Sequence, residues 1–96
     1  MRKIIDGKVY DTKTSTAVWS RDNGLYSNDF NYKSTDLFKT KKGAFFVANY
    51  FYLNDDNFIY TLENTNSVIK FLEKHRVEID ETIADLTGIK FENIEG

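Results

Sequence analysis

The sequence contains no cysteine and no proline among its 96 residues, and it contains one histidine, His75. The absence of cysteine excludes disulfide bonds, thiolate zinc sites, iron–sulfur clusters and cysteine nucleophiles within these residues. Covalent catalysis needs a nucleophile beside a base, and His75 stands at the end of an apolar stripe with helical spacing. Such a position favours a structural role, because a protonated imidazole is stabilised at the C-terminal end of a helix. We therefore predict that the protein is not an enzyme and holds no metal and no cofactor.

Long hydrophobic runs are also absent. The longest candidate, residues 44–53, contains Asn49 and two tyrosines, and it is much shorter than the ~20 residues of a membrane-spanning helix. The two basic residues at the N-terminus are followed by only two apolar residues, a pattern that does not fit a signal peptide. We expect a protein of the cytoplasm that has no membrane partner.

Hydrophobic residues make up 41% of the sequence and aromatic residues 16%, which is enough to build one domain over residues 1–96. The formal net charge of −2 excludes the strongly basic balance of a free-standing DNA-binding domain. Residues 1–45 carry 9 Lys and Arg against 5 Asp and Glu, whereas residues 46–96 carry 4 against 10. This imbalance is typical either of ordinary surface solvation or of one face that engages a charged partner.

The first two thirds of the sequence alternate between apolar segments and turn residues. Asp6 and Gly7 form a hairpin signal, and Gly43 can adopt the left-handed conformation that a tight turn needs. Residues 26–32 predict an extended but irregular segment. Residues 44–53 are apolar on both faces, which indicates a central strand that is covered on both sides. The expected strands of this antiparallel meander are residues 3–5, 8–10, 16–20, 36–40, 44–53 and 58–62.

The last third of the sequence changes its period. Apolar residues recur at helical spacing, and the apolar face of this first helix is formed by Val68, Ile69, Phe71 and Leu72. Candidate N-caps are Asn64, Thr65 and Asn66. A second, short helix extends from a cap at Asp80 to Gly88. We predict an α+β fold in which an antiparallel sheet of four to five strands carries two C-terminal helices on one face.

Two tyrosines close to two aspartates form the candidate protein-binding surface, which comprises Tyr50, Tyr52, Asp55 and Asp56. Tyrosine is enriched at interfaces because it buries a large area at little entropic cost, and adjacent carboxylates suit a basic partner surface. The alternative is that the tyrosines lie beneath the helices with their hydroxyls at the rim, while the aspartates form a turn. No further ligand follows at the spacing of a calcium loop, so we predict no metal at the aspartates.

Three lysines gather at the turn before the long strand, namely Lys39, Lys41 and Lys42. A basic hairpin tip beside aromatic residues is able to contact nucleic acid through phosphate pairing and base stacking. A solvated turn explains the same residues without a ligand. The sequence has no RNA-recognition, helix-turn-helix or zinc-finger motif that supports the nucleic-acid interpretation.

Two blocks of the sequence resemble a known group of proteins. Residues 2–15 read Arg-Lys-Ile-Ile-Asp-Gly-Lys-Val-Tyr-Asp-Thr-Lys-Thr-Ser, and residues 36–46 read Asp-Leu-Phe-Lys-Thr-Lys-Lys-Gly-Ala-Phe-Phe. They resemble small proteins of phages and other mobile elements of Firmicutes, which carry Lys-Lys-Ile-Ile-Asn-Gly-Lys-x-Tyr-Asp-Thr-x-Thr-Ala and Leu-Tyr-x-Thr-Lys-Lys-Gly-x-Phe-Phe. The sequence departs from that group at residues 47–53, where those proteins often continue with a glycine-rich segment.

The resemblance implies a setting in which small proteins inhibit host defence, including anti-CRISPR proteins. The leading hypothesis is therefore an inhibitor that binds a protein partner stoichiometrically in the bacterial host cytoplasm. The expected partner is a single-protein CRISPR effector nuclease, and the inhibitor is expected to be a monomer or a homodimer. The alternative is a regulatory module that binds nucleic acid through the basic hairpin.

Overall fold

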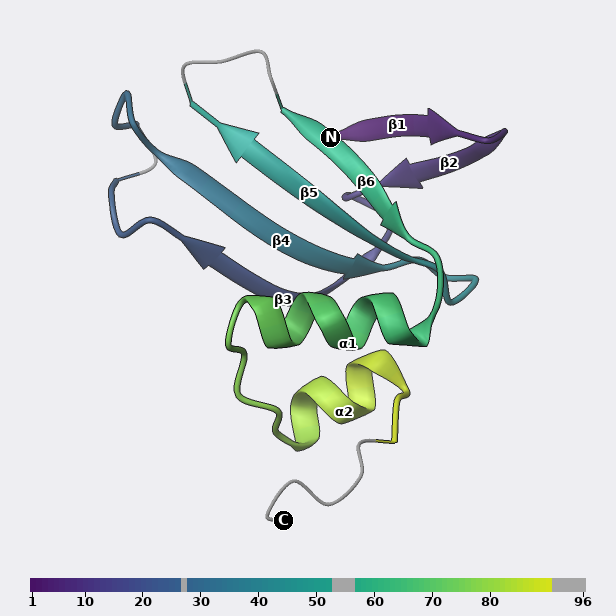
Figure 1. Cartoon of the computed structure of the whole chain (residues 1–96). Helices are drawn as coiled ribbons and strands as arrows, with labels where there is room; N and C mark the ends of the chain where they lie inside the picture. The colour runs from purple at the N-terminus through teal and green to yellow at the C-terminus, as the bar shows by residue number, and fades with distance from the viewer. Residues whose placement is uncertain (27, 53–56, 91–96) are drawn as a thin grey trace.

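A computed structural model describes residues 1–26, 28–52 and 57–90 of the chain. The predicted α+β architecture is confirmed: four antiparallel strands form one sheet in the order β3-β4-β5-β6, and two helices follow them (Figure 1). The first hairpin, β1-β2, forms a two-stranded sheet of its own. The elements are β1 (Arg2–Ile5), β2 (Lys8–Asp11), β3 (Thr16–Asp22), β4 (Lys33–Lys39), β5 (Phe45–Phe51), β6 (Phe58–Leu62), α1 (Thr65–Lys74) and α2 (Glu81–Thr87).

The turns form where the sequence predicts them. Asp6 and Gly7 adopt φ angles of 51° and 75° between β1 and β2, which matches the left-handed pair of a two-residue hairpin turn. Gly43 adopts a φ of 89° after β4, and its N–H donates to the carbonyl of Thr40 at 2.9 Å. The first turn places Ile5 opposite Lys8, and the second places Leu37 opposite Val47 and Phe38 opposite Phe46.

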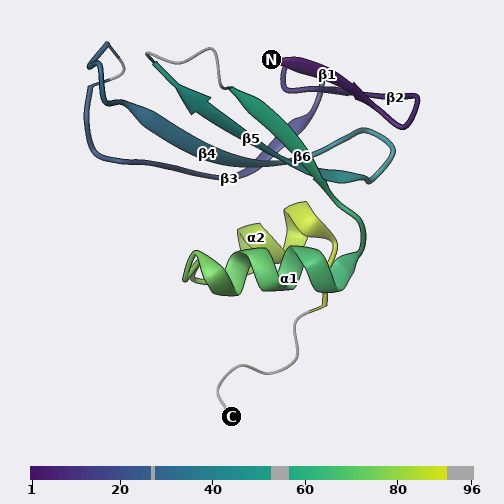
Figure 2. The same cartoon turned by 45° about the horizontal axis from the view of Figure 1, so that its top comes forward.

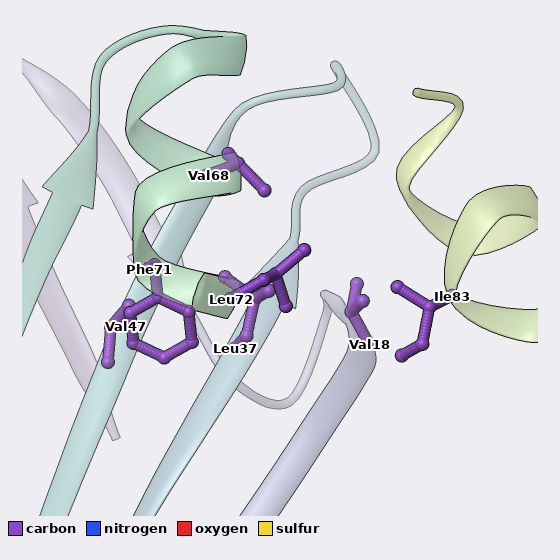
Figure 3. Packing of buried hydrophobic residues seen from close by; sticks show 7 residues of the cluster. All are labelled: Val18, Leu37, Val47, Val68, Phe71, Leu72 and Ile83. Atoms are coloured by element: carbon purple, nitrogen blue, oxygen red, sulfur yellow. The ribbon is translucent and has the colours of Figure 1, made fainter. Parts of the chain in front are cut away.

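One face of the sheet packs against both helices. Phe71 and Leu72 of α1 approach Val47 and Leu37, and Ile83 of α2 lies beside Val18 (Figure 3). Leu37, Val47 and Val68 have no exposed surface, so this cluster is the main hydrophobic core. The buried members of the cluster are Val18, Leu37, Val47, Val68, Phe71, Leu72 and Ile83.

The other face of the sheet is covered in part by the β1-β2 hairpin. Figure 2 shows the two helices on one side of the sheet and the hairpin on the opposite side. Tyr10 of β2 meets Phe46 edge-on with ring centroids 5.5 Å apart, and Phe38 stacks on Phe46 at 5.2 Å. Ala48 and Ile59 complete this second, smaller core. The prediction that the long strand is central is therefore confirmed, and its coverage on both sides holds for Phe46, Val47 and Ala48 of β5.

Both helices begin and end as the sequence predicts. The side chain of Asn64 accepts a hydrogen bond from the Ser67 N–H and caps α1. Asp80 caps α2 in the same way through the Ile83 N–H, and Gly88 ends it at a φ of 70°. Within the described residues, neither helix is long and apolar enough to span a membrane.

Candidate functional site

Aromatic residues gather at the end of the sheet where β4 begins and β5 ends. The rings of Phe30 and Tyr52 lie 6.2 Å apart, and those of Tyr32 and Tyr50 lie 5.9 Å apart. Phe30 is 68% exposed and Tyr52 42%, whereas Tyr32 and Tyr50 are half-buried. We call these four residues the aromatic patch. Tyr26 of the same β3-β4 loop is 85% exposed.

The loop that carries Phe30 and Tyr32 is held by its own polar side chains. The Asn23 amide nitrogen donates to the carbonyl of Asn31 at 2.7 Å, and a carboxylate oxygen of Asp29 accepts the Asn31 N–H at 2.8 Å. The N–H of Tyr32 donates to the carbonyl of Asp29 at 3.0 Å. The predicted extended segment is thus a hydrogen-bonded loop, because Asn and Asp side chains satisfy the backbone locally.

The strand register brings the loop to the end of β5. The N–H of Tyr52 donates to the carbonyl of Tyr32 at 3.1 Å, so the two chain segments stay paired beyond the last residues of the strands. Tyr50 stands opposite Ser34 and alternates with Phe46 and Ala48 of the second core. It therefore faces away from the helices, and the alternative that it lies beneath them is wrong.

The structure places only part of the predicted protein-binding surface. Tyr50 and Tyr52 belong to the aromatic patch, whereas Asp55 and Asp56 lie outside the described residues. Phe30 and Tyr32 are members that the sequence interpretation missed. Their signal was the density of aromatic residues in an otherwise polar loop, and a binding role for these residues stays a prediction.

A second row of aromatic rings lies on the helix-bearing face of the same sheet end. Phe58 stacks between Phe51 and Tyr60, with centroid distances of 6.4 Å and 6.1 Å. Burial raises the pKa of the Tyr60 hydroxyl above its usual value. The sequence interpretation placed these residues in strands and gave them no further role. It missed the exposure of Phe58 and Tyr60 on the edge strand β6.

The three predicted basic residues take different positions. Lys41 and Lys42 are exposed in the β4-β5 turn. Lys39 is half-buried, and its Nζ lies 3.4 Å from the Thr87 carbonyl oxygen and 5.6 Å from the centroid of the Phe45 ring. Its ammonium group therefore binds the C-terminal end of α2, as expected for a cation beside unpaired helix carbonyls.

Lys8 of β2, rather than Lys39, lines the same groove as Lys41 and Lys42. These three lysines line a groove of about 530 Å³ between the two hairpins, which we call the lysine groove. Thr14, Ser15 and Thr40 add hydroxyl groups to its lining, and the described residues that line it include no carboxylate. Nucleic-acid contact by Lys39, Lys41 and Lys42 stays a prediction, and Lys8 is a groove residue that the sequence interpretation did not assign to this site.

His75 caps the C-terminal end of α1, as predicted, but its pKa shifts in the direction opposite to the one expected for an imidazole that is stabilised in its protonated form. Its ring lies 4.4 Å from that of Phe71 and 5.4 Å from that of Trp19. Burial lowers the pKa of His75 below 6.5, and the positive charges of Lys74 and Arg21 lower it further. The guanidinium of Arg21 instead supplies the cation at the helix end, where its Nη1 donates to the His75 carbonyl at 2.7 Å.

Within the described residues, no group of three or more His, Asp or Glu side chains is arranged to hold a metal ion. Comparisons with protein-family models, curated proteins and solved structures find no match for the chain.

Proposed function

We propose that the protein is a non-enzymatic inhibitor that binds a bacterial defence protein through the aromatic patch. The partner in this proposal is a single-protein CRISPR effector nuclease, a choice that comes from the resemblance of residues 2–15 and 36–46 to proteins of phages and mobile elements. The observation that carries the proposal is the exposure of Phe30 and Tyr52 at one end of the sheet.

The aromatic patch has the features of an interface core. Large rings supply contact area at low entropic cost because each has only two rotatable side-chain torsions. The rings are paired, Phe30 with Tyr52 and Tyr32 with Tyr50, and the second pair is half-buried. The loop is already held by Asn23 and Asp29, so little ordering remains to be done on binding, which favours affinity.

The acidic second half of the chain suits the basic channels of nucleases. Its exposed carboxylates lie on and around the two helices, at Glu63, Glu73, Glu78, Asp80, Glu81 and Asp85. Such charges accelerate association with a basic surface and help to fix its orientation. In this proposal the patch supplies most of the affinity and the carboxylates supply steering.

The test is a DNA-cleavage assay in which the protein is titrated against several single-protein CRISPR nucleases of Firmicutes. We expect cleavage to stop at a one-to-one ratio with at least one nuclease. The double variant Phe30→Ser and Tyr52→Ala should weaken inhibition by at least about tenfold, as expected when central interface rings are truncated. Ile4→Ala removes an equally exposed apolar side chain of β1 and should leave inhibition unchanged. Uninhibited cleavage at excess protein with every nuclease would refute the proposal.

The lysine groove favours a second candidate function, the binding of nucleic acid. The described residues of its lining bring together three ammonium groups and several hydroxyls and include no carboxylate, although the chain as a whole carries a net charge of −2. We expect single-stranded DNA or RNA to bind with an affinity that falls steeply as salt rises. Reversing Lys41 and Lys42 to glutamate should abolish this binding, whereas Lys13→Glu in the turn after β2 should weaken it only slightly. Absence of binding at low salt would eliminate this candidate.

A further inference from the structure

A pocket of about 210 Å³ lies on the helix-bearing face of the sheet, at the same end as the aromatic patch. Thr35 and Asn49 stand opposite each other on β4 and β5 and form its floor. Trp19 and His75 bound it on the side of α1, and Phe51 bounds it on the side of β6. Arg21 and Lys33 complete the lining. We call this the Trp19 pocket.

The Arg21 side chain is fixed before any ligand arrives. Its guanidinium carbon lies 4.9 Å from the centroid of the Trp19 ring, and its Nη1 donates to the His75 carbonyl at 2.7 Å. A guanidinium has five N–H donors, so this single bond leaves others for a ligand. Because the group is already held in place, it loses little conformational freedom when it binds.

The other polar groups of the pocket are also mainly donors. The Thr35 hydroxyl donates to Oδ1 of Asn49 at 2.9 Å, and the amide nitrogen of Asn49 has no hydrogen bond within the described residues. Lys33 adds an exposed ammonium group. Asp22, the carboxylate among the described lining residues, accepts the Gly24 N–H at 2.8 Å, and the two cationic side chains of the lining, Arg21 and Lys33, outnumber it. The pocket therefore matches a ligand that accepts hydrogen bonds and carries negative charge.

We propose that the Trp19 pocket receives the carboxylate side chain of a glutamate or aspartate from the protein partner. An ionised carboxylate is an acceptor only, with about four lone-pair sites, and its pairing with a guanidinium is among the stronger hydrogen-bonded interactions. The volume of 210 Å³ is below the ~300 Å³ at which small-molecule sites begin, which fits one side chain. The rings of Trp19 and Phe51 offer contact area to the methylene groups of that side chain.

The position of the pocket links it to the aromatic patch. Lys33 follows Tyr32 in the sequence, and Phe51 lies between Tyr50 and Tyr52. Strand alternation places Phe51 on the face that carries the helices and Tyr50 on the opposite face. A partner segment that passes around this end of the sheet meets the patch on one face and the pocket on the other. The inference rests on the proposed function in taking the bound carboxylate to belong to a protein.

The test uses the isotopically labelled protein and three probes: the capped peptide acetyl-Gly-Glu-Gly-amide, its Gln counterpart and inorganic phosphate. Nuclear magnetic resonance follows the Asn49 side-chain amide and the indole N–H of Trp19, which is the one tryptophan of the chain. We expect the Glu peptide to shift both signals saturably and the Gln peptide at equal concentration to leave them unchanged. Equal shifts with both peptides, no shift with either, or shifts with phosphate alone would overturn the proposal.

Two variants separate the pocket from general charge effects. Lys33→Gln removes an exposed ammonium group without touching the Arg21 contacts and should weaken Glu-peptide binding about fivefold, the loss expected for a well-placed ion pair at the protein surface. Lys3→Gln removes an exposed ammonium group of β1, outside the pocket, and should leave Glu-peptide binding unchanged. Equal weakening by both variants would also overturn the proposal. The peptide assay needs no nuclease, so a negative result here is distinct from failure of the proposed inhibition.

Discussion

The two ends of the four-stranded sheet carry similar aromatic residues, which are buried at one end and exposed at the other. At the end where β5 begins, Phe46 and Val47 have no exposed surface, because the β1-β2 hairpin covers one face and the helices cover the other. At the end where β5 finishes, Tyr52, the residue that follows the strand, is exposed. The alternation of apolar residues is the same at both ends. Coverage by neighbouring elements therefore decides which aromatic rings become core and which become surface.

The largest expected effect comes from removing a ring at the covered end. Phe46→Ala should lower the free energy of unfolding by about 3–5 kcal/mol, because it deletes a fully buried ring and leaves a cavity. Tyr52→Ala at the open end should lower it by less than about 1 kcal/mol. Urea unfolding followed by circular dichroism measures both values. Similar losses for the two variants would contradict the contrast between the ends.

Removing the contact of the β1-β2 hairpin with the sheet face opposite the helices should produce the next largest loss in the free energy of unfolding. Tyr10→Ala removes the ring that meets Phe46 edge-on at 5.5 Å, so we expect a loss of about 2–3 kcal/mol from lost burial and the lost aromatic pair. Val9→Ala changes the neighbouring residue of β2, whose side chain is exposed, and should cost less than about 0.5 kcal/mol. If the two variants unfold at the same urea concentration, the hairpin contributes little to the covered end.

Weakening α2, which packs on the helix-bearing face of the sheet, should lower the free energy of unfolding by a smaller amount. Asp80 accepts the Ile83 N–H at 2.9 Å and caps α2, so Asp80→Ala should cost about 1 kcal/mol. Asp80→Asn retains an acceptor and should cost much less. Asp85→Ala, on the exposed side of the same helix, is the control for loss of a carboxylate. Equal stability of Asp80→Ala and Asp85→Ala would show that the cap does not hold α2 against the sheet.

Local signals account for the parts of the fold that the sequence predicted. The turn at Asp6 and Gly7 and the turn at Gly43 depend on backbone conformations that few residues adopt. The caps Asn64 and Asp80 act over three residues. Each of these features depends on residues within a short stretch of sequence, so its position was predictable from residue type alone.

Long-range pairing explains most of what was missed. β4 begins at Lys33 rather than at residue 36 because Ser34 and Thr35 pair with Tyr50 and Asn49, and their polar side chains gave no apolar pattern. The same pairing brings Tyr32 to Tyr52 and creates the aromatic patch from segments 20 residues apart. The register of such a strand pair depends on the whole sheet, so it cannot be predicted from either segment alone.

A β-bulge in β3 explains why the alternation of residues did not predict the Trp19 pocket. Val18 lies in the irregularity between the pairs Ala17–Phe38 and Trp19–Leu37, so Val18 and Trp19 both pack against the helix-side core. Simple alternation would place these neighbours on opposite faces. The bulge is what turns Trp19 toward His75 at the boundary between the covered and open ends of the sheet.

The smallest expected effect is the pH response of His75 at this boundary. Its pKa is lowered in the folded protein by burial first, then by Lys74 and Arg21, so the unfolded chain binds the proton more tightly. Linkage then requires the free energy of unfolding to fall as pH falls below about 6.5, the ordinary pKa of histidine, until the lowered folded value is passed. Urea unfolding at pH 7.5 and pH 5.5 measures the loss. Other groups titrate in the same range, so the difference between the wild type and His75→Gln isolates the contribution of this ring.

Direct titration of the imidazole by nuclear magnetic resonance sharpens the same comparison. We expect a pKa below 6.5 in the wild type. Lys74→Gln should raise it toward 6.5 because one of the two nearby positive charges is removed, whereas Lys13→Gln, in the turn after β2, should leave it unchanged. A wild-type pKa above 6.5 would mean that the attraction of the helix C-terminus outweighs burial and the neighbouring cations. In that case the stability of the folded protein would rise, rather than fall, as His75 becomes protonated.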